Sequence, residues 1–207
     1  MQLNIVSEVV GKWQENSYMI NIDGEAWLID PGDNFSVLDA SFNLNKLNSK
    51  GILCTHAHFD HVGAVSFFMD KYDLPFYLHP ADKKILRQAN LYRKLAGSSD
   101  FFEVPKVIYF LNDQLFFKIG TREILIHHTP GHTEGSVSFE IENNLFSGDI
   151  IFKNSLGRVD LPGGNIELLR NSVRFILTNF KGYTIYPGHG DPFVLTQDVI
   201  NNLNKLI

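Results

Sequence analysis

The sequence predicts an α/β protein in which helices cover the outer faces of mixed β-sheets. The chain has 207 residues, which is enough to bury a sizeable core without disulfides. Its hydrophobic content of 44% and charged content of 20% are ordinary for a globular protein. Short β-prone runs are interspersed with longer runs of helical periodicity, an order typical of layered architectures with helices outside the sheets. The pattern alone leaves the number of sheets open.

The first half of the chain begins with a predicted β-hairpin. Residues 17–22 and 25–30 are β-prone runs, and the Asp23-Gly24 pair between them is a strong turn signal. The apolar spacing that follows predicts, in order, a helix over 35–47, a buried strand over 51–54, a helix over 62–72, a strand over 75–78 and a helix over 80–96 that starts at Pro80.

The second half is predicted to be mostly β-sheet, with helices near its end. Five β-prone runs separated by turn residues span 106–110, 114–119, 123–128, 136–141 and 144–147. A Gly- and Pro-containing loop follows over 150–165, and then we expect a helix over 166–179, a strand over 183–186 and a helix over 196–206. Because no repeat, low-complexity segment or linker interrupts this order, we expect a single domain over residues 1–207.

The composition disfavours several classes of function. The formal net charge is −5, which disfavours a nucleic-acid partner because phosphate binding needs clustered Lys and Arg. Cys54 is the only cysteine, so no intramolecular disulfide can form, and we interpret it as a small buried hydrophobe. No apolar run approaches the roughly 18 residues of a membrane span, and the N-terminus does not resemble a signal peptide. We therefore expect a cytoplasmic protein that contacts neither nucleic acid nor membrane.

A cluster of potential metal ligands follows the predicted strand over 51–54. The segment THAHFDH, residues 55–61, holds three of the eight histidines and an aspartate. Residues two apart in an extended chain point the same way, so His56 and His58 can bind one cation together. Asp60 and His61 lie where the backbone bends towards a helix, and we expect them to point elsewhere, at a second cation.

Three further candidate ligands each follow a different predicted strand. They are His132, Asp149 and His189, and a glycine precedes every one of them. Glycine lets the backbone approach a crowded centre without strain. Imidazole and carboxylate groups without thiolate suit zinc, iron or manganese. The sequence thus predicts seven metal ligands at four strand ends.

These motifs together resemble the metallo-β-lactamase superfamily and, within it, the short glyoxalase II-like (hydroxyacylglutathione hydrolase-like) thioesterases. The matching segments are THAHFDHVGA, HTPGHTEGSVSF, FSGDIIF and YPGHG, with NSYMI and WLIDPG nearer the start. The resemblance covers nearly the whole chain. It implies an αββα four-layer sandwich of two mixed β-sheets flanked by helices, with the metals at one edge of the sheets.

The resemblance also implies a role for each of the seven candidate ligands. His56, His58 and His132 would bind a first divalent metal ion, Asp60, His61 and His189 a second, and Asp149 would bridge the two. Zinc is the expected metal, with iron or manganese as alternatives. A hydroxide between the ions would be the nucleophile, with Asp60 as the catalytic side chain beside it. Two such ions lower the pKa of water and polarise a carbonyl.

The implied reaction is hydrolysis of a small-molecule thioester such as an S-acyl glutathione. Thiolate is a good leaving group, so the reaction needs no strong general acid. Full-length glyoxalase II enzymes carry a further helical domain with basic residues that hold glutathione, whereas only one predicted helix follows His189 here. We therefore expect glutathione to bind through other groups, or the thiol to be a different one.

Three alternatives stay open. Persulfide dioxygenases share this scaffold but use one iron, held by the counterparts of His56, His132 and Asp149. A second alternative is hydrolysis of a lactone or another ester, and a third is a metal-dependent regulatory domain without catalysis. The number and identity of the metals bound per chain distinguish oxidation from hydrolysis.

Several other polar residues have two interpretations each. Asp30 either orients a metal-bound histidine or ends a strand as a turn residue, and Asp191 has the same two readings with the turn favoured. Arg158 either meets an anionic group of the substrate, held by Asp160, or belongs to a solvated loop. We interpret the remaining three histidines as structural residues outside the site: His79, His127 and His128.

Overall fold

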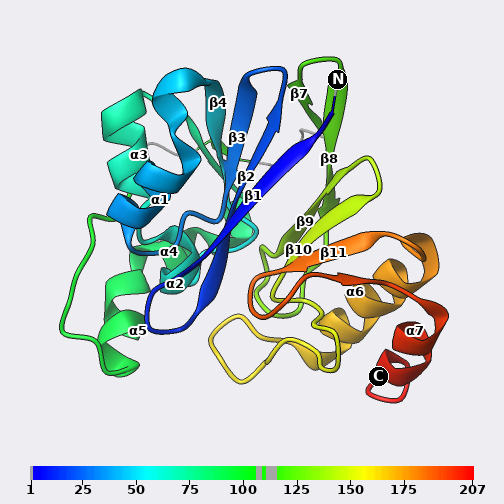
Figure 1. Cartoon of the computed structure of the whole chain (residues 1–207). Helices are drawn as coiled ribbons and strands as arrows, with labels where there is room; N and C mark the ends of the chain where they lie inside the picture. Colours follow the sequence, from blue (N-terminus) through cyan, green and yellow to red (C-terminus); the bar gives the residue numbers. More distant parts are fainter. Residues whose placement is uncertain (1, 106–108, 111–115) are drawn as a thin grey trace.

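The computed structural model describes residues 2–105, 109–110 and 116–207, and it shows two β-sheets packed face to face between outer helices (Figure 1). The first sheet contains, in spatial order, β1 (Asn4–Val10), β2 (Glu15–Ile22), β3 (Glu25–Ile29), β4 (Asn48–Leu53), β5 (Phe76–Leu78) and β6 (Tyr109–Phe110). The second contains β12 (Phe193–Val194), β11 (Thr184–Pro187), β10 (Asn144–Gly148), β9 (Val137–Ile141), β8 (Arg122–His128) and β7 (Phe116–Ile119). Each sheet mixes antiparallel and parallel pairs.

The space between the two sheets is filled by side chains that alternate along the strands. Successive residues of a strand point to opposite faces, so Trp27 and Ile29 of β3 face the second sheet. There the Trp27 ring lies 4.7 Å from that of Phe117 on β7. Other members of this apolar layer are Tyr18, Ile20, Leu53, Ile124, Phe139 and Phe146. This shared layer joins the sheets and so fixes how their edge loops meet.

Helices cover both outer faces. On the first sheet lie α1 (Phe35–Phe42), α3 (Val65–Tyr72), α4 (Lys83–Arg87) and α5 (Ala89–Leu95), where Phe68 packs in one cluster with Leu28 and Ile52. On the second sheet lie α6 (Ile166–Asn179) and α7 (Gln197–Leu203), where Val173 packs in one cluster with Ile185. The predicted αββα sandwich is therefore confirmed.

Most predicted elements match observed ones to within a few residues, but three predicted helices are interrupted. The helix predicted over 35–47 stops at Phe42 because Asn43 takes a left-handed conformation with φ of 49°. The one over 62–72 is broken at Gly63 and Ala64, between α2 (Phe59–Val62) and α3. There the Ala64 N–H donates to the Pro31 carbonyl outside the helix, and the Gly32 carbonyl lies so close to Gly63 that a Cβ would collide with it.

The third interrupted helix, over 80–96, begins as a 3₁₀ turn at Pro80–Asp82 and continues as α4 and α5. The sequence does not predict β1, an edge strand that pairs with β2. The strands predicted over 106–110 and 114–119 lie partly outside the described residues, and their described parts are β6 and β7.

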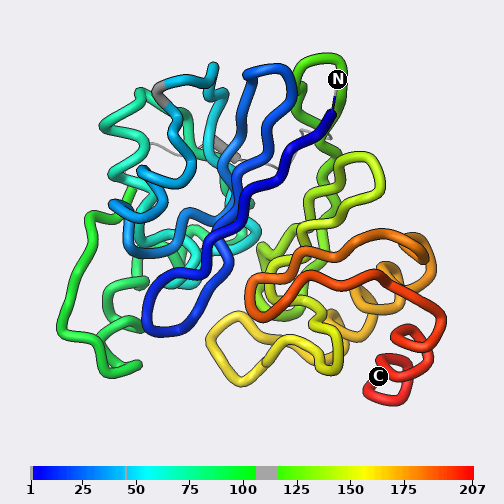
Figure 2. The backbone as a smooth tube through the Cα atoms, in the orientation of Figure 1, coloured from blue at the N-terminus to red at the C-terminus, as the bar shows by residue number. Residues whose placement is uncertain are grey.

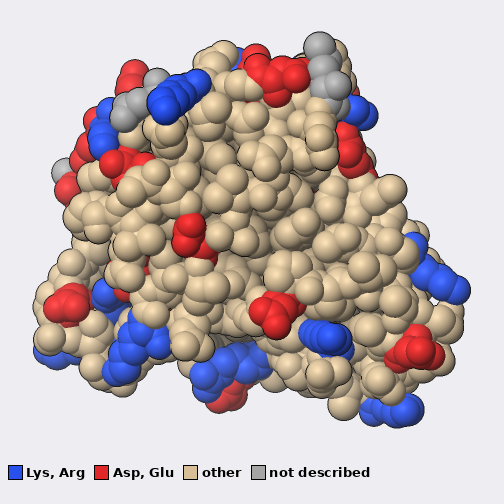
Figure 3. Space-filling view, viewed as in Figure 1, with Lys and Arg blue, Asp and Glu red and all other residues tan. Residues whose placement is uncertain are grey.

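Loops from both sheets meet at one edge of the sandwich. Figure 2 shows the β1–β2 turn, in blue, beside the loop over 150–165, in yellow. The face seen in Figure 3 is largely uncharged over its centre, with Lys, Arg, Asp and Glu scattered towards its rim. None of the helices in the described part of the chain combines the length and apolar character that a bilayer crossing requires.

Candidate metal centre

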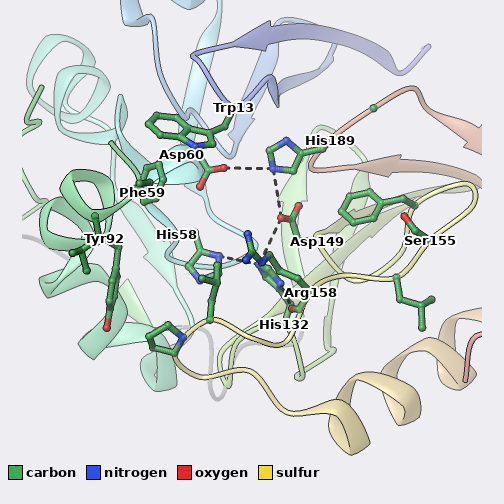
Figure 4. Close-up of a pocket in the computed structure, with 17 residues that line it drawn as sticks. Trp13, His58, Phe59, Asp60, Tyr92, His132, Asp149, Ser155, Arg158 and His189 are labelled. Carbon is green, nitrogen blue, oxygen red and sulfur yellow. Dashed lines mark hydrogen bonds and ion pairs between the residues drawn. The ribbon is translucent and has the colours of Figure 1, made fainter. Parts of the chain in front are cut away.

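The seven predicted ligands meet at this edge, in the segments that follow four strands. His56 and His58 follow β4, and Asp60 and His61 lie in the short helix α2. The other three follow β8, β10 and β11 of the second sheet: His132, Asp149 and His189. Figure 4 shows five of the seven converging: His58, Asp60, His132, Asp149 and His189.

A first group consists of three buried imidazoles, His56, His58 and His132. Nε2 of His56 lies 3.1 Å from Nδ1 of His58, which lies 2.9 Å from Nε2 of His132. Nitrogen ligands around a tetrahedral zinc are about 3.3 Å apart, given Zn–N bonds of about 2.05 Å. On the far side of its ring, His132 Nδ1 donates to the Arg158 carbonyl at 2.8 Å, which leaves Nε2 with a free lone pair. The donor atoms of the first group therefore fit a small divalent cation.

A second group consists of Asp60, His61 and His189, whose ligand atoms all lie within 4.8 Å of one another. Nε2 of His189 lies 3.4 Å from Oδ2 of Asp60. Nε2 of His61 is buried and has no hydrogen-bond partner, although such atoms are nearly always paired. A cation bound by the second group would satisfy this atom.

Asp149 lies between the two groups. Its Oδ2 is 3.6 Å from Nε2 of His132 and 3.5 Å from Nε2 of His189, and its Oδ1 is 3.6 Å from Nε2 of His61. Oδ1 is a second buried atom without a hydrogen-bond partner. The Gly188 backbone passes so close that a Cβ there would collide with Oδ1. One carboxylate thus faces histidines of both groups, as a bridging ligand would.

Asp30 contacts residues of both groups on the side away from the cavity: His61 of the second group, and Thr55, which precedes His56 of the first. Its Oδ2 accepts from Nδ1 of His61 at 3.0 Å, which directs Nε2 of His61 towards the centre. The same carboxylate accepts from the backbone N–H of Thr55 at 2.7 Å and from its hydroxyl at 2.6 Å. Asp30 also has a positive φ of 49°, so it both orients a histidine and ends its strand. Asp191 is exposed and lies outside this network.

Asp82 is a supporting residue that the sequence reasoning missed. Its buried carboxylate accepts from the backbone N–H groups of Ala57 at 2.9 Å and Gly135 at 2.8 Å, and from the Thr133 hydroxyl at 2.9 Å. Ala57 separates His56 from His58, and Thr133 follows His132. Asp82 therefore holds together the two loops that carry the first group. The only available signal was an acidic residue inside a predicted helix.

The His189 loop is held by β2, which the sequence reasoning also missed. The Asn16 amide donates to the carbonyls of Pro187 at 2.9 Å and Gly190 at 2.6 Å, and the Tyr18 hydroxyl donates to Pro187 at 2.6 Å. Nδ1 of His189 lies 3.2 Å from the Gln14 carbonyl. The NSYMI motif carries these contacts, but its spacing alone says nothing about a partner more than 160 positions away.

The two groups differ in their electrostatics. Burial, followed by the neighbouring His132, lowers the pKa of His58 to about 3, and burial likewise holds the pKa of His56 well below its ordinary value. Burial alone would lower the pKa of His189, but Asp149 and Asp60 outweigh it and raise the pKa to about 11. Histidine binds cations in its neutral form. His56 and His58 are therefore in their ligand form at neutral pH, whereas His189 must exchange a proton for a cation.

The centre opens into a cavity of about 920 Å³. Arg158 lines it, and the guanidinium donates to both Asp160 oxygens at 2.7 Å, as the sequence suggested. The three histidines assigned to structural roles lie outside the cluster. His79 stacks on His128 with ring centroids 4.4 Å apart, and His127 pairs with Glu140 at 2.6 Å.

Comparison with known proteins agrees with this architecture. Residues 10–189 match the family model of the metallo-beta-lactamase superfamily. The probable metallo-hydrolase YqgX of Bacillus subtilis is 34% identical over 91% of this chain and 91% of its own length. Two solved structures are also 34% identical. The BLEG-1 B3 metallo-beta-lactamase has a TM-score of 0.87 over 96% of this chain and 98% of its own.

The second of these structures is TTHA1623 in a di-iron-bound form, with a TM-score of 0.85 over 98% of this chain and 100% of that one. The family model spans most of the chain, and these relatives match it over nearly their whole lengths. This chain belongs to the metallo-β-lactamase superfamily.

Proposed function

We propose that the chain is a binuclear metal-dependent hydrolase of the glyoxalase II-like type that cleaves a small-molecule thioester. This proposal rests mainly on the position of Asp149, whose carboxylate faces histidines of both groups. Its Oδ1 and the nearby Nε2 of His61 are buried and have no hydrogen-bond partner. A relative called a probable metallo-hydrolase and a neighbour solved with two irons support it. The metal is zinc in this proposal, and iron fits the same donors.

In this proposal, different residues bind each cation and orient the attacking water. His56, His58 and His132 would hold one cation, Asp60, His61 and His189 the other, and Asp149 both. Bound divalent cations supply a nucleophile at neutral pH by lowering the pKa of water, and they polarise a carbonyl. Asp60, whose Oδ2 lies 3.4 Å from His189 Nε2 at the open side of the centre, would accept a hydrogen bond from the attacking water and orient it.

A thioester suits the groups around the centre. Tyr92 lines the cavity, but its hydroxyl donates to the Gln88 side chain at 2.8 Å and is not directed at the ligands. Arg158 is paired with Asp160, and a guanidinium does not release its proton at neutral pH. A thiolate leaves without being protonated, so hydrolysis of a thioester needs no acid from the protein.

A single-iron persulfide dioxygenase is the second candidate. Two histidines and one carboxylate, His56, His132 and Asp149, form the donor set that non-haem iron oxygenases use. In that case the second group would hold no metal. Purified protein with about one iron and no zinc per chain, and oxygen uptake on persulfide, would favour this candidate.

Asp60→Ala tests the hydrolytic proposal. We expect the variant to fold, to bind about one cation per chain in place of two, and to lose thioesterase activity at least about a hundredfold. Asp70→Ala, an exposed aspartate on α3, is the matched control and should keep both cations and full activity. Metal analysis and circular dichroism accompany the assay. Equal turnover by Asp60→Ala and the parent protein would overturn the proposal.

A further inference from the structure

We infer that this site acts on substrates whose groups on both sides of the scissile bond are apolar and uncharged, and that glutathione conjugates are poor substrates. The inference rests on the proposed thioesterase function and concerns the substrate class. It follows from the two walls of the 920 Å³ cavity and from the charges that line it.

The first wall is aromatic and aliphatic. Trp13, at the β1–β2 turn, packs edge-on against Phe59 with ring centroids 4.6 Å apart. Tyr92, Leu95 and Ala96, from α5 and its C-terminal end, extend this wall. Figure 4 shows Trp13, Phe59 and Tyr92 together on one side of the metal ligands. A group bonded to the reacting carbonyl on this side would therefore contact carbon atoms.

Two cations lie near Trp13, and neither lines the cavity: exposed Lys12, whose Nζ is 5.6 Å from the ring centroid, and buried Arg93. Arg93 is not available to a substrate. It is only 6% exposed, and its guanidinium donates to Asp33 at 3.1 Å. The guanidinium carbon lies 5.7 Å from the Trp13 ring centroid, so the charge stabilises the indole from behind. Arg93 therefore fixes the wall and leaves its inner surface apolar.

The second wall comes from the loop over 150–165. Phe152, Leu156, Leu161 and Pro162 line the cavity there. The loop is anchored beside the centre because the Arg158 carbonyl accepts from His132. In Figure 4, Ser155 of this loop lies on the opposite side of the ligands from Trp13 and Phe59. The centre thus sits between two apolar walls, and both halves of a substrate would contact one.

The charges that line the cavity disfavour an anionic substrate. Among the described lining residues Arg158 is the one Lys or Arg, and Asp160 already neutralises it through two hydrogen bonds of 2.7 Å. Glutathione carries two carboxylates and an ammonium group. Burying such groups without partners costs free energy, whereas each apolar carbon placed against these walls gains it. The cavity volume lies in the range that holds a ligand of drug-like size.

The test is a matched series of thioesters on metal-loaded protein. Acetyl, butyryl and hexanoyl groups are each joined to benzyl mercaptan, N-acetylcysteamine and glutathione, three alkyl thiols of similar leaving ability. We expect kcat/KM for benzyl thioesters to exceed that for glutathione thioesters at least about tenfold with the same acyl group. We also expect it to rise up to about fourfold per added methylene that becomes buried.

Two leucines on α5 provide a matched pair of variants. Leu95 lines the cavity and is 75% exposed, and Leu91 is 51% exposed and does not line it. Neither substitution by serine removes a core side chain. Leu95→Ser should lower kcat/KM for the hexanoyl thioester of benzyl mercaptan about threefold. Leu91→Ser should leave this value unchanged.

The possible outcomes distinguish a failure of this inference from a failure of the proposed thioesterase function. A preference for glutathione thioesters, or equal rates across the three thiols, would overturn the inference and leave the thioesterase proposal intact. Failure to hydrolyse any thioester in the series, with two cations bound per chain, would overturn both.

Discussion

The two ligand groups of the metal centre are built differently, although they lie side by side. The first group contains only imidazoles, and His56, His58 and His132 are 1%, 7% and 2% exposed. The second group contains a carboxylate, and the side chains of His189 and Asp60 are 28% and 14% exposed. The first is held by the buried carboxylate of Asp82, which joins two loops. In the second, Asp30 holds His61, and contacts from β2 hold the His189 loop.

Because of this difference, we expect the two cation sites to differ in how their affinity depends on pH. The first group is buried and fixed, and the lowered pKa values of His56 and His58 keep these two ligands neutral, so the group should bind its cation over a wide range of pH. In the second group, Asp60 and Asp149 raise the pKa of His189 to about 11, so a cation must displace a proton there.

The largest effect is expected from Asp149→Ala, because Asp149 faces both groups. Removing it should abolish binding of the second cation, weaken the first, and reduce hydrolytic activity at least about a thousandfold. Mass spectrometry of metals and steady-state kinetics measure the two losses. A variant that still bound two cations per chain would show that Asp149 does not bridge the groups.

Asp82→Ala should damage the first group alone. It leaves the N–H groups of Ala57 and Gly135 and the Thr133 hydroxyl without their acceptor, which costs about 3 kcal/mol of unfolding free energy. Affinity for the first cation should fall about 10- to 100-fold, as for other residues that orient ligands. Chemical denaturation and competition with a chelator measure the two effects. Asp82→Asn, which keeps one acceptor oxygen, should recover part of both.

The ligands could be predicted from the sequence, and their supports could not. Five of the ligands follow β-prone runs at strand ends, and Asp60 and His61 come next in the same motif, within α2. The family resemblance pairs these segments, which lie far apart in the chain. Asp82 lies in a 3₁₀ turn within a segment predicted as a helix, and its partners lie 25 to 53 positions away. Asn16 contacts carbonyl oxygens more than 170 positions away. Such bonds depend on how two sheets pack, and local periodicity carries no information about that.

The edge strand β1 was missed for a related reason. Its run NIVSEVV has no clean alternation of apolar and polar residues, and in the structure only its last residue is fully buried. Most of its order comes from the antiparallel ladder with β2. Trp13 lies in the turn between β1 and β2 and lines the cavity. The strand β1, which has no strong sequence signal, therefore helps to position one wall of the cavity.

The two groups should also respond differently to pH in metal-free protein. The pKa of His58 is about 3 when folded and near 6.5 when unfolded, so only the unfolded chain gains this proton as the pH falls below 6.5. Stability should therefore fall between pH 6.5 and 3 by up to about 1.4 kcal/mol per pH unit from this residue. For His189 the folded pKa is raised, so its contribution is complete below pH 6.5 and is lost as the pH rises towards 11.

Single substitutions assign these two slopes. His58→Gln should flatten the acid side of the stability curve, and His189→Gln should flatten the alkaline side. Urea unfolding of chelator-treated protein between pH 4 and 10 is the measurement. An unchanged acid slope in His58→Gln would mean that other groups govern acid unfolding.

The smallest effect is expected from Asn16→Ala, which tests the support of the second group. The amide donates to two carbonyls of the His189 loop, and water can replace one of them because Gly190 lies at the rim of the cavity. We expect a loss of about 1 kcal/mol of unfolding free energy and a few-fold weaker second cation, with the first cation unaffected. Stepwise metal titration resolves the two sites. Equal weakening of both cations would show that β2 supports the centre as a whole, and that the two groups are less independent than their separate contacts indicate.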